Sequence, residues 1–349
     1  MQDAQAASPG DRMVGQPIAH SSYRDTRYAA SKAKLTSGRA TLARRTRIRG
    51  KSLLRRRSRI PALRITLVHN PTAGAQGMDA EALIRLLKKA GHAVRYQSRK
   101  ERRFALALGK PADLIAVAGG DGTIDKVAER MPRGAPPLAI IPVGNANNIA
   151  ASLGIEGPIE SIVAQWETAS RRELNCWEAC GPWGRRFIVE GVGIGSVADT
   201  IAKLKARHRK ATVLQACATL SKRLKKKNGA RKARVQTDSR TIEDTFAILE
   251  VLNFGYIGPR LRLAPDADPF DGCLDVVCVG ADQRSAFIAW LESHGAGDPP
   301  VSYHRSANVA LTWNDGPIHL GDKVWCGETK NGRWTAEIRR AHGVEVLVP

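Results

Sequence analysis

The sequence predicts an α/β fold, with a parallel sheet in its first half and a strand-rich second half. Between residues 64 and 153, short apolar runs alternate with helical patterns, which is typical of a parallel sheet with helices packed on its faces. Residues 183–349 instead alternate short β-branched runs with turns, as in Thr245–Leu252, Leu274–Val279 and Val344–Val348. This second pattern indicates strands joined by turns.

The first strand and helix are the clearest of these elements. The apolar run Arg64–His69 ends at Asn70-Pro71 and indicates a buried strand. Asp79 is a typical helix N-cap, and the leucines at 83, 86 and 87 form one apolar face before Gly91 ends the helix. We therefore expect a strand–helix unit over residues 64–91.

The alternation continues with shorter elements. Further strands are predicted at Val94–Gln97, Asp113–Ala118 and Leu138–Pro142. Further helices are predicted at Phe104–Leu108, from Ile124 to about Arg130, and from the Gly144–Asn148 segment to Leu153.

Polar, glycine-containing loops follow three of the predicted strands: Asn70–Gly74, Gly119–Thr123 and Gly144–Asn148. In parallel α/β sheets, ligands bind beyond the carboxyl ends of the strands. The three loops are therefore expected to lie at one edge and to form one site.

The loop Gly119–Thr123 has the composition of a phosphate-binding turn. Its glycines allow the backbone to approach a phosphate, the helix dipole favours negative charge, and Thr123 adds a hydroxyl donor. Asp121 would repel a phosphate unless it meets a metal ion or a reacting hydroxyl. A tight turn with an Asp cap is the structural alternative. The loop has neither the P-loop pattern nor the dinucleotide fingerprint.

The net charge of +22 comes from two segments. Residues 1–64 contain 16 Lys and Arg against three Asp, and residues 203–234 contain 13 Lys and Arg with no acid. The first is expected to be a flexible tail, functional or not, and the second contains a predicted helix around Ala211–Leu224. The positive charge of both segments favours binding to an anionic membrane surface. Nucleic acid is not favoured, because Tyr23 and Tyr28 are too few for a stacking platform.

The rest of the composition is that of a globular protein, with 43% hydrophobic and 25% charged residues. No apolar run approaches the roughly 20 residues of a membrane-spanning helix, and the N-terminus lacks the apolar core of a secretory signal. We therefore expect a cytoplasmic protein whose cysteines are reduced. Those cysteines are Cys176, Cys180, Cys217, Cys273, Cys278 and Cys326.

Three motifs in order resemble the diacylglycerol kinase catalytic-domain family, which also contains sphingosine and ceramide kinases and bacterial lipid kinases. They are Asn70-Pro71-Thr72-Ala73-Gly74, Gly-Gly-Asp-Gly-Thr at 119–123, and Pro142–Ala150. The resemblance continues through Phe187–Asp199, Pro265–Val279 and Cys326-Gly327-Glu328. It covers about residues 64–349.

This resemblance implies an α/β nucleotide-binding domain with the Gly-Gly-Asp-Gly loop, followed by a mainly antiparallel β-sandwich domain, with the active site in the cleft. The implied division is a basic tail at 1–63, a catalytic domain at 64–172 and a β-rich domain at 173–349. The implied reaction transfers the γ-phosphate of ATP, with Mg²⁺, to the hydroxyl of a lipid such as diacylglycerol or a sphingoid lipid. The enzyme would work peripherally at the inner face of the membrane.

The resemblance also assigns residues. Glu328 would be the general base and Asp121 part of the reacting cluster. The residues implied to bind nucleotide are Asn70, Gly74, Ser98, Gly119, Gly120, Asp121, Gly122, Thr123, Gly144, Asn145 and Asn147. Asp271 would belong to the Mg²⁺-linked site, with the backbone oxygens of Asp268 and Cys273 beside it.

The sequence departs from the family pattern at four positions. Ala73 replaces the usual Ser and Asn145 the usual Thr, while Lys126 stands where the family usually has Glu. Cys326 replaces the Asp of an Asp-Gly-Glu motif. Two alternatives therefore stay open: an NAD kinase, which shares the Gly-Gly-Asp-Gly loop, and a catalytically silent protein that binds nucleotide or anionic lipid. The sequence leaves the acceptor lipid and the oligomeric state open.

Overall fold

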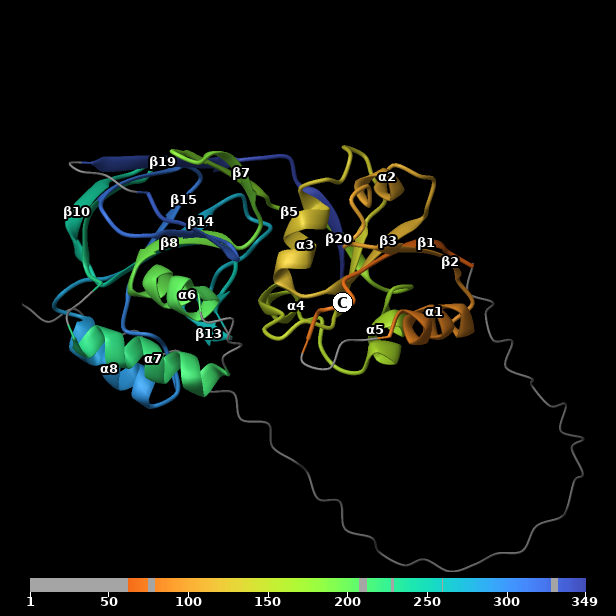
Figure 1. Ribbon diagram of the computed structural model, residues 1–349, viewed down its shortest axis with the longest axis horizontal. Coiled ribbons are helices and arrows are strands. Elements are labelled where there is room, and N and C mark those ends of the chain that lie inside the picture. The colour runs from red at the N-terminus through yellow and green to blue at the C-terminus, as the bar shows by residue number, and fades with distance from the viewer. Residues whose placement is uncertain (1–61, 75–78, 207–211, 227–228, 259, 328–331) are drawn as a thin grey trace, which may run out of the picture. The chain divides into compact units, whose positions relative to one another are not determined.

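The computed structural model describes residues 62–74, 79–206, 212–226, 229–258, 260–327 and 332–349 (Figure 1). An α/β part contains one six-stranded sheet, and a β part contains two further six-stranded sheets and a two-stranded ribbon. All described residues belong to one compact unit.

The first sheet has the strand order β2-β1-β3-β4-β20-β5. The first four strands run parallel, and their pairing brings the carboxyl ends of β1, β3 and β4 to one edge. Its strands are β1 (Arg64–His69), β2 (Ala93–Ser98), β3 (Leu114–Gly119), β4 (Leu138–Pro142), β5 (Ser170–Leu174) and β20 (Val344–Val348). The helices of this part are α1 (Ala80–Lys89), α2 (Ala105–Leu108), α3 (Asp121–Ala128), α4 (Asn148–Ser152) and α5 (Ile159–Gln165).

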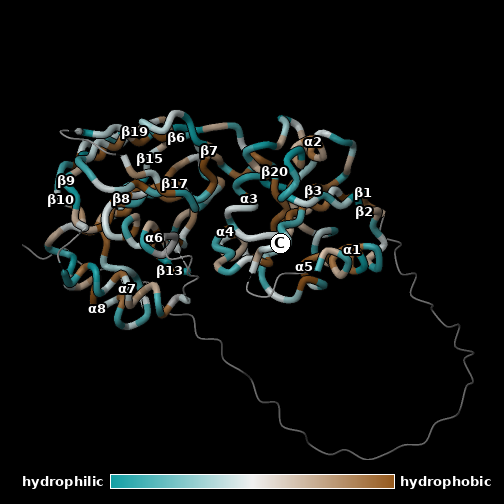
Figure 2. The backbone as a smooth tube through the Cα atoms, in the orientation of Figure 1, coloured by the Kyte–Doolittle hydropathy of each residue, from teal (hydrophilic) through white to brown (hydrophobic). Residues whose placement is uncertain are grey.

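Helices cover both faces of this sheet. Leu83 and Leu87 of α1 and Val163 of α5 pack in one core with alternate residues of β1, β3 and β4. The opposite face of the sheet packs against α2, α3 and α4, including Val127 and Ile149. Figure 2, in which the backbone is coloured by the hydropathy of each residue, shows hydrophobic residues along these strands. The doubly wound arrangement predicted from the alternation is therefore confirmed.

Most predicted elements have nearly their expected bounds, with two exceptions. The run Thr245–Leu252 is divided between two strands of different sheets, Thr241–Phe246 and Ile248–Leu252, and α3 begins earlier than predicted. The helix was expected from Ile124, whereas the structure begins it at Asp121 with Gly120 as N-cap. The predicted loop residues Asp121–Thr123 are thus the first turn of the helix. The reason is that Gly120 has the extended backbone of an N-cap, so the helix begins three residues sooner.

The last strand of the chain returns to the first sheet. β20 pairs parallel to β4 through Val346 and Leu138, and antiparallel to β5 along its length. The sequence pattern identified Val344–Val348 as a strand but contained no signal for the sheet that it joins.

The other sheets form a sandwich of mainly antiparallel strands, as the resemblance implied. One has the order β10-β9-β16-β19-β6-β7, and the other has the order β15-β14-β11-β8-β17-β18. The first contains β6 (Trp177–Gly181), β7 (Gly184–Ile188), β9 (Arg231–Gln236), β10 (Thr241–Phe246), β16 (Val309–Asn314) and β19 (Arg333–Arg340). The second contains β8 (Gly191–Gly195), β11 (Ile248–Leu252), β14 (Leu274–Val279), β15 (Ser302–Ser306), β17 (Ile318–Leu320) and β18 (Lys323–Trp325). The ribbon pairs β12 (Tyr256–Ile257) with β13 (Leu261–Arg262).

Side chains of the two large sheets meet in one core. Trp177 and Trp313 from one sheet pack with Val251 and Val276 from the other. The second sheet also packs its other face against α6 (Ser196–Ala206), α7 (Val213–Lys225) and α8 (Arg284–Glu292) (Figure 1). The sheet that contributes to the cleft is therefore buried on both faces.

The basic segment 203–234 forms part of this helical layer. The predicted helix corresponds to α7, whose N-cap Thr212 makes a capping box with Gln215. Several cations of the segment are paired with carboxylates from elsewhere: Arg223 and Arg231 with Asp199, Lys225 with Glu292, and Lys232 with Glu243. Only part of the basic charge is therefore available to an external partner. The basic segment 1–61 lies outside the described residues.

Within the part of the chain that the structure describes, no helix is long and apolar enough to cross a bilayer. All six cysteines are free thiols, as expected.

Candidate functional site

The three glycine-containing loops meet at the carboxyl edge of the first sheet. The backbones of Gly120 and Gly144 lie so close that a Cβ on Gly120 would stand 3.1 Å from the Gly144 Cα. Gly74 has a φ of +76°, and a Cβ there would lie 2.5 Å from the Val143 carbonyl oxygen. Side chains at these positions would separate the loops, which explains the need for glycine.

Hydrogen bonds hold the loops together. The Asn70 amide donates to the Thr123 hydroxyl at 3.2 Å. The Asp121 carboxylate accepts from the Ile149 backbone N–H at 2.9 Å, which joins α3 to α4. Burial raises the pKa of Asp121, and backbone hydrogen bonds from Ile149 and Asn148 oppose the shift. Asp121 thus has a positioning role in the loops, and its catalytic role stays a prediction.

Asn147 stabilises the third loop from within. Its φ of 53° places it in the left-handed region, which Asn tolerates better than most residues. Its side chain accepts from the Gly144 N–H and donates to the carbonyl oxygens of Pro142 and Gly144. The neighbouring Asn145 is exposed and faces the cleft instead.

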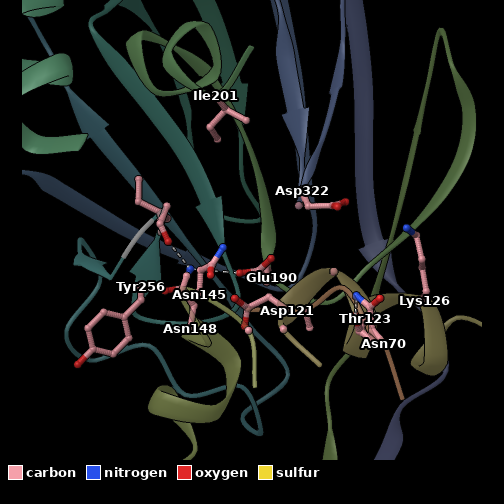
Figure 3. Close-up of a pocket in the computed structure, with 18 of the residues that line it drawn as sticks. Asn70, Asp121, Thr123, Lys126, Asn145, Asn148, Glu190, Ile201, Tyr256 and Asp322 are labelled. Atoms are coloured by element: carbon pink, nitrogen blue, oxygen red, sulfur yellow. Dashed lines mark hydrogen bonds between the residues drawn. The ribbon is translucent and has the colours of Figure 1, made fainter. Parts of the chain in front are cut away.

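A cleft of about 430 Å³ lies between these loops and the β part. Figure 3 shows the side chains that line it. Eight of the predicted nucleotide-binding residues are among the lining residues: Asn70, Gly74, Gly120, Asp121, Gly122, Thr123, Gly144 and Asn145.

The three other predicted residues are not among those that line the cleft. Gly119 ends β3, and a Cβ there would meet the Thr123 side chain. Asn147 holds the third loop as described. Ser98 ends β2, where its hydroxyl accepts from the Lys100 N–H at 3.3 Å. The next residue, Arg99, reaches the cleft.

The opposite wall contributes two carboxylates that the sequence analysis did not identify. Asp322 lies in the turn between β17 and β18, and its Oδ2 would be 2.7 Å from a Cβ on Gly122. Glu190, just before β8, accepts a hydrogen bond of 3.4 Å from the Asn148 amide. Burial, followed by repulsion from Asp121 and Asp125, raises the pKa of Glu190 well above its usual value. Both carboxylates line the cleft.

Asp125 lies on α3 one turn after Asp121. Its carboxylate is buried and accepts from the Val189 N–H at 3.2 Å. Burial, and then repulsion from Asp322, raises its pKa to about 7. The sequence contains weak signals for these acids, because Gly321-Asp322 follows a short apolar strand and Glu190 precedes the Gly-rich run at 191–195.

A buried acid–base pair lies at the floor of the cleft. His319 lines the cleft, and its Nε2 lies 2.6 Å from Oε2 of the fully buried Glu250. Burial raises the pKa of Glu250, while the charge and hydrogen bond of His319 oppose that shift. This pair was also missed from the sequence.

The predicted metal-linked residues are not among those that line the cleft. Asp271 forms an ion pair with Arg305 and accepts from the Cys273 N–H at 2.7 Å. Asp268 accepts from the Phe270 N–H and lies 4.0 Å from Arg172. Their link to Mg²⁺ stays a prediction. The predicted general base, Glu328, lies outside the described residues.

Comparisons with known proteins agree with this architecture. Residues 64–179 match the family model described as diacylglycerol kinase catalytic domain. Residues 191–330 match the model described as YegS C-terminal NAD kinase beta sandwich-like domain.

Two relatives with kinase names are similar in sequence to this chain. The chain is 25% identical over 267 residues to a diacylglycerol kinase of Bacillus subtilis (strain 168), covering 71% of this chain and 85% of that protein. It is 31% identical over 224 residues to the Pseudomonas aeruginosa protein named "Probable lipid kinase YegS-like", covering 61% of this chain and 70% of the relative. An NAD kinase is therefore not favoured.

The fold has been seen in a solved structure of a diacylglycerol kinase from Bacillus anthracis str. Sterne. It aligns with a TM-score of 0.60 at 17% identity, over 82% of this chain and 97% of the other. Together with the glycine loops and the matched domains, these relatives establish that the chain belongs to the diacylglycerol kinase catalytic-domain family of lipid kinases.

Proposed function

We propose that this protein is a lipid kinase that transfers the γ-phosphate of ATP to the hydroxyl of a lipid, such as diacylglycerol or a sphingoid lipid. The observation that carries the proposal is the composition of the cleft. One wall consists of phosphate-type loops, and the other combines apolar side chains with a carboxylate that faces those loops.

The loop wall suits the phosphates of a nucleotide. The eight-residue helix α3 begins inside the cleft, so its first backbone N–H groups and its positive dipole end are directed to bound anions. Gly120, Gly122 and Gly144 present backbone without side chains. Thr123 and Asn70 add polar side chains beside them.

The β wall suits a lipid alcohol. Ile201, Leu252 and Ile257 line it, with Tyr256 beside them. Apolar side chains in a cleft favour an acceptor that carries hydrocarbon next to its hydroxyl. This separation of polar and apolar walls supports a lipid acceptor over a dinucleotide.

Asp322 is the carboxylate best placed to receive the proton of that hydroxyl. It forms no ion pair with any residue that the structure describes, and it packs over Gly122 of the phosphate loop. A general base must lie beside both the acceptor hydroxyl and the phosphoryl group that the hydroxyl attacks. Asp322 is therefore an alternative to Glu328 as the general base.

Mg²⁺ would neutralise the phosphate charge during transfer. Within the described ranges, no group of three or more His, Cys, Asp or Glu residues is arranged to hold a metal by itself. Mg²⁺ is commonly held by one or two carboxylates together with substrate phosphates. Asp121 and Glu190 fit this chemistry, because both line the cleft and Asp121 raises the pKa of Glu190 by repulsion that a cation would relieve. These two residues would hold the ion.

We also propose that the enzyme meets its lipid by peripheral association with an anionic membrane surface. The basic segments 1–64 and 203–234 supply the charge for this attraction.

A phosphate-transfer assay with labelled ATP tests the function. The acceptors are diacylglycerol, a sphingoid base, ceramide and NAD, each with the parent and with the Asp322→Asn and Glu328→Gln variants. We expect the parent to phosphorylate at least one lipid alcohol and not NAD. We expect Asp322→Asn to lose about 10²–10⁴-fold in kcat, as is typical for a lost general base, with ATP affinity retained.

Two outcomes would contradict these assignments. If Glu328→Gln loses that activity and Asp322→Asn does not, Glu328 is the base, as the family resemblance implied. If the parent binds ATP but phosphorylates no lipid alcohol, the silent-protein alternative replaces the kinase.

A further inference from the structure

Two basic side chains reach the same corner of the cleft from different elements. Arg99 follows β2, and its backbone N–H donates to the His69 carbonyl oxygen at 2.8 Å, next to the loop that begins at Asn70. Lys126 lies on α3 one helical turn after Gly122, on the face that also carries Thr123. Both residues line the cleft. Figure 3 shows Lys126 on the same side as Asn70 and Thr123.

This corner contains two cations, and the carboxylates of Asp322 and Asp125 act on one of them, Lys126, from nearby. Neither Arg99 nor Lys126 forms an ion pair with a residue in the described ranges, and the buried Nε of Arg99 has no hydrogen-bond partner there. Burial and repulsion from Arg99 lower the pKa of Lys126, against an opposite effect of Asp322 and Asp125. Half-buried cations of this kind are stabilised when an anion binds between them.

The neighbouring groups indicate which anion fits. Arg99 offers a planar set of N–H donors that matches phosphate oxygens, and Lys126 offers a compact charge. The hydroxyl of Thr123 and the first turn of α3 lie beside them. The apolar residues Ile201 and Tyr256 lie at the other side of the cleft in Figure 3, so the corner belongs to the nucleotide wall.

We propose that Arg99 and Lys126 form an anion subsite for the terminal phosphate of the nucleotide, so that this pair sets the preference for a triphosphate. The inference rests on the proposed nucleotide-dependent function. It also gives a role to Lys126, which departs from the acidic residue usual in the family. A phosphate group on a lipid acceptor has the same chemistry, and the experiment separates the two sources.

The test measures equilibrium binding of ATP, ADP and AMP to the full chain by calorimetry, with divalent cations chelated and no lipid present. The variants are Lys126→Gln and Arg99→Gln, with Lys126→Arg to retain the charge. The matched controls are Lys110→Gln and Arg102→Gln, which remove one charge each from exposed side chains outside the cleft.

We expect each cleft variant to weaken ATP binding about 10- to 100-fold, the range for a lost hydrogen bond to a charged group. AMP affinity should change less than twofold, Lys126→Arg should retain most ATP binding, and the controls should match the parent. Unchanged thermal unfolding of each variant would show that the fold is retained.

The proposal is wrong if Lys126→Gln weakens AMP and ATP equally, or weakens neither. It is also wrong if the variant binds ATP normally but requires more of a phosphate-bearing lipid, such as phosphatidylglycerol, for half-maximal transfer. Because binding is measured without lipid, the subsite stands if the ATP pattern holds while no lipid is phosphorylated, and only the proposed function then fails.

Discussion

Glu250 has an exposed fraction of 0%, and the contact of its carboxylate with the His319 ring stabilises it in this buried position. A Cβ on Gly193 would collide with the Glu250 carboxylate, so the adjacent strand leaves room for the acid only because it has glycine there. Burying a carboxylate without a partner is costly, whereas a close pair with good geometry recovers part of that cost. The pair therefore fixes β17, and with it the turn that carries Asp322, to β11 through β8.

We predict that His319→Ala lowers the free energy of unfolding by about 3–5 kcal/mol, the usual cost of leaving one partner of a buried pair. Urea denaturation monitored by circular dichroism would measure it. Glu250→Gln is the matched variant, because the amide keeps the size and one hydrogen bond, and it should cost less. A loss below about 1 kcal/mol in His319→Ala would show that water or a rearranged side chain replaces the histidine.

At the scale of elements, α3 carries several of the charged residues of the site. Asp121 and Asp125 lie one turn apart, with Lys126 beside them, and both Asp121 and Lys126 line the cleft. Asp125 also joins α3 to the segment before β8 through the Val189 N–H. Its pKa is raised from 3.8 to about 7, so the folded protein binds this proton more tightly than the unfolded chain.

The stabilisation from that proton is complete below about pH 4 and is lost as the pH rises through about 7. Asp125→Asn removes the titration while its amide oxygen still accepts from Val189. We predict that the free energy of unfolding of this variant, relative to the parent, rises between pH 5 and pH 8 by about 3 kcal/mol. Denaturation at a series of pH values measures it, with the exposed Asp298→Asn as control. A difference that is constant with pH would contradict the prediction.

The sequence was informative for elements whose signals are local. The strand Arg64–His69 and the Asp79-capped helix were predictable, because burial periodicity and capping act within a few residues. The glycine loops were predictable for the same reason. Asp322 and Glu190 were not, because their approach to the loops depends on how β17 and β8 pack against α3, and no local pattern encodes that distance.

At the scale of the whole molecule, β20 joins the two ends of the folded part, because it follows the strands of the sandwich in the chain and pairs with β4 and β5 in the first sheet. Such a long-range pairing has no local sequence signature, because the same β-branched pattern is compatible with a strand in either sheet. It links the end of the chain to the strand that precedes the third phosphate-type loop. Both walls of the cleft are thereby held within one compact unit.

The distribution of charge over the whole molecule leads to the last prediction. Within the 203–234 segment, ion pairs occupy Arg223, Lys225, Arg231 and Lys232. Lys222 and Lys226 are exposed and form no ion pair with a described residue. These two lysines, at the end of α7, are therefore the ones in this helix that are available to lipid headgroups.

We predict that the full chain binds vesicles containing phosphatidylglycerol in a salt-sensitive way and binds neutral phosphatidylcholine vesicles more weakly. Replacing Lys222 and Lys226 by Gln should weaken binding by roughly fivefold per charge, since each basic residue contributes about 1 kcal/mol at an anionic surface. Lys88→Gln with Lys89→Gln removes the same charge from exposed positions on α1 and should have no comparable effect. Cosedimentation at several salt concentrations measures these affinities. Equal binding to neutral and anionic vesicles would contradict the membrane proposal, whereas equal weakening by both lysine pairs would mean that net charge, rather than the end of α7, determines the attraction.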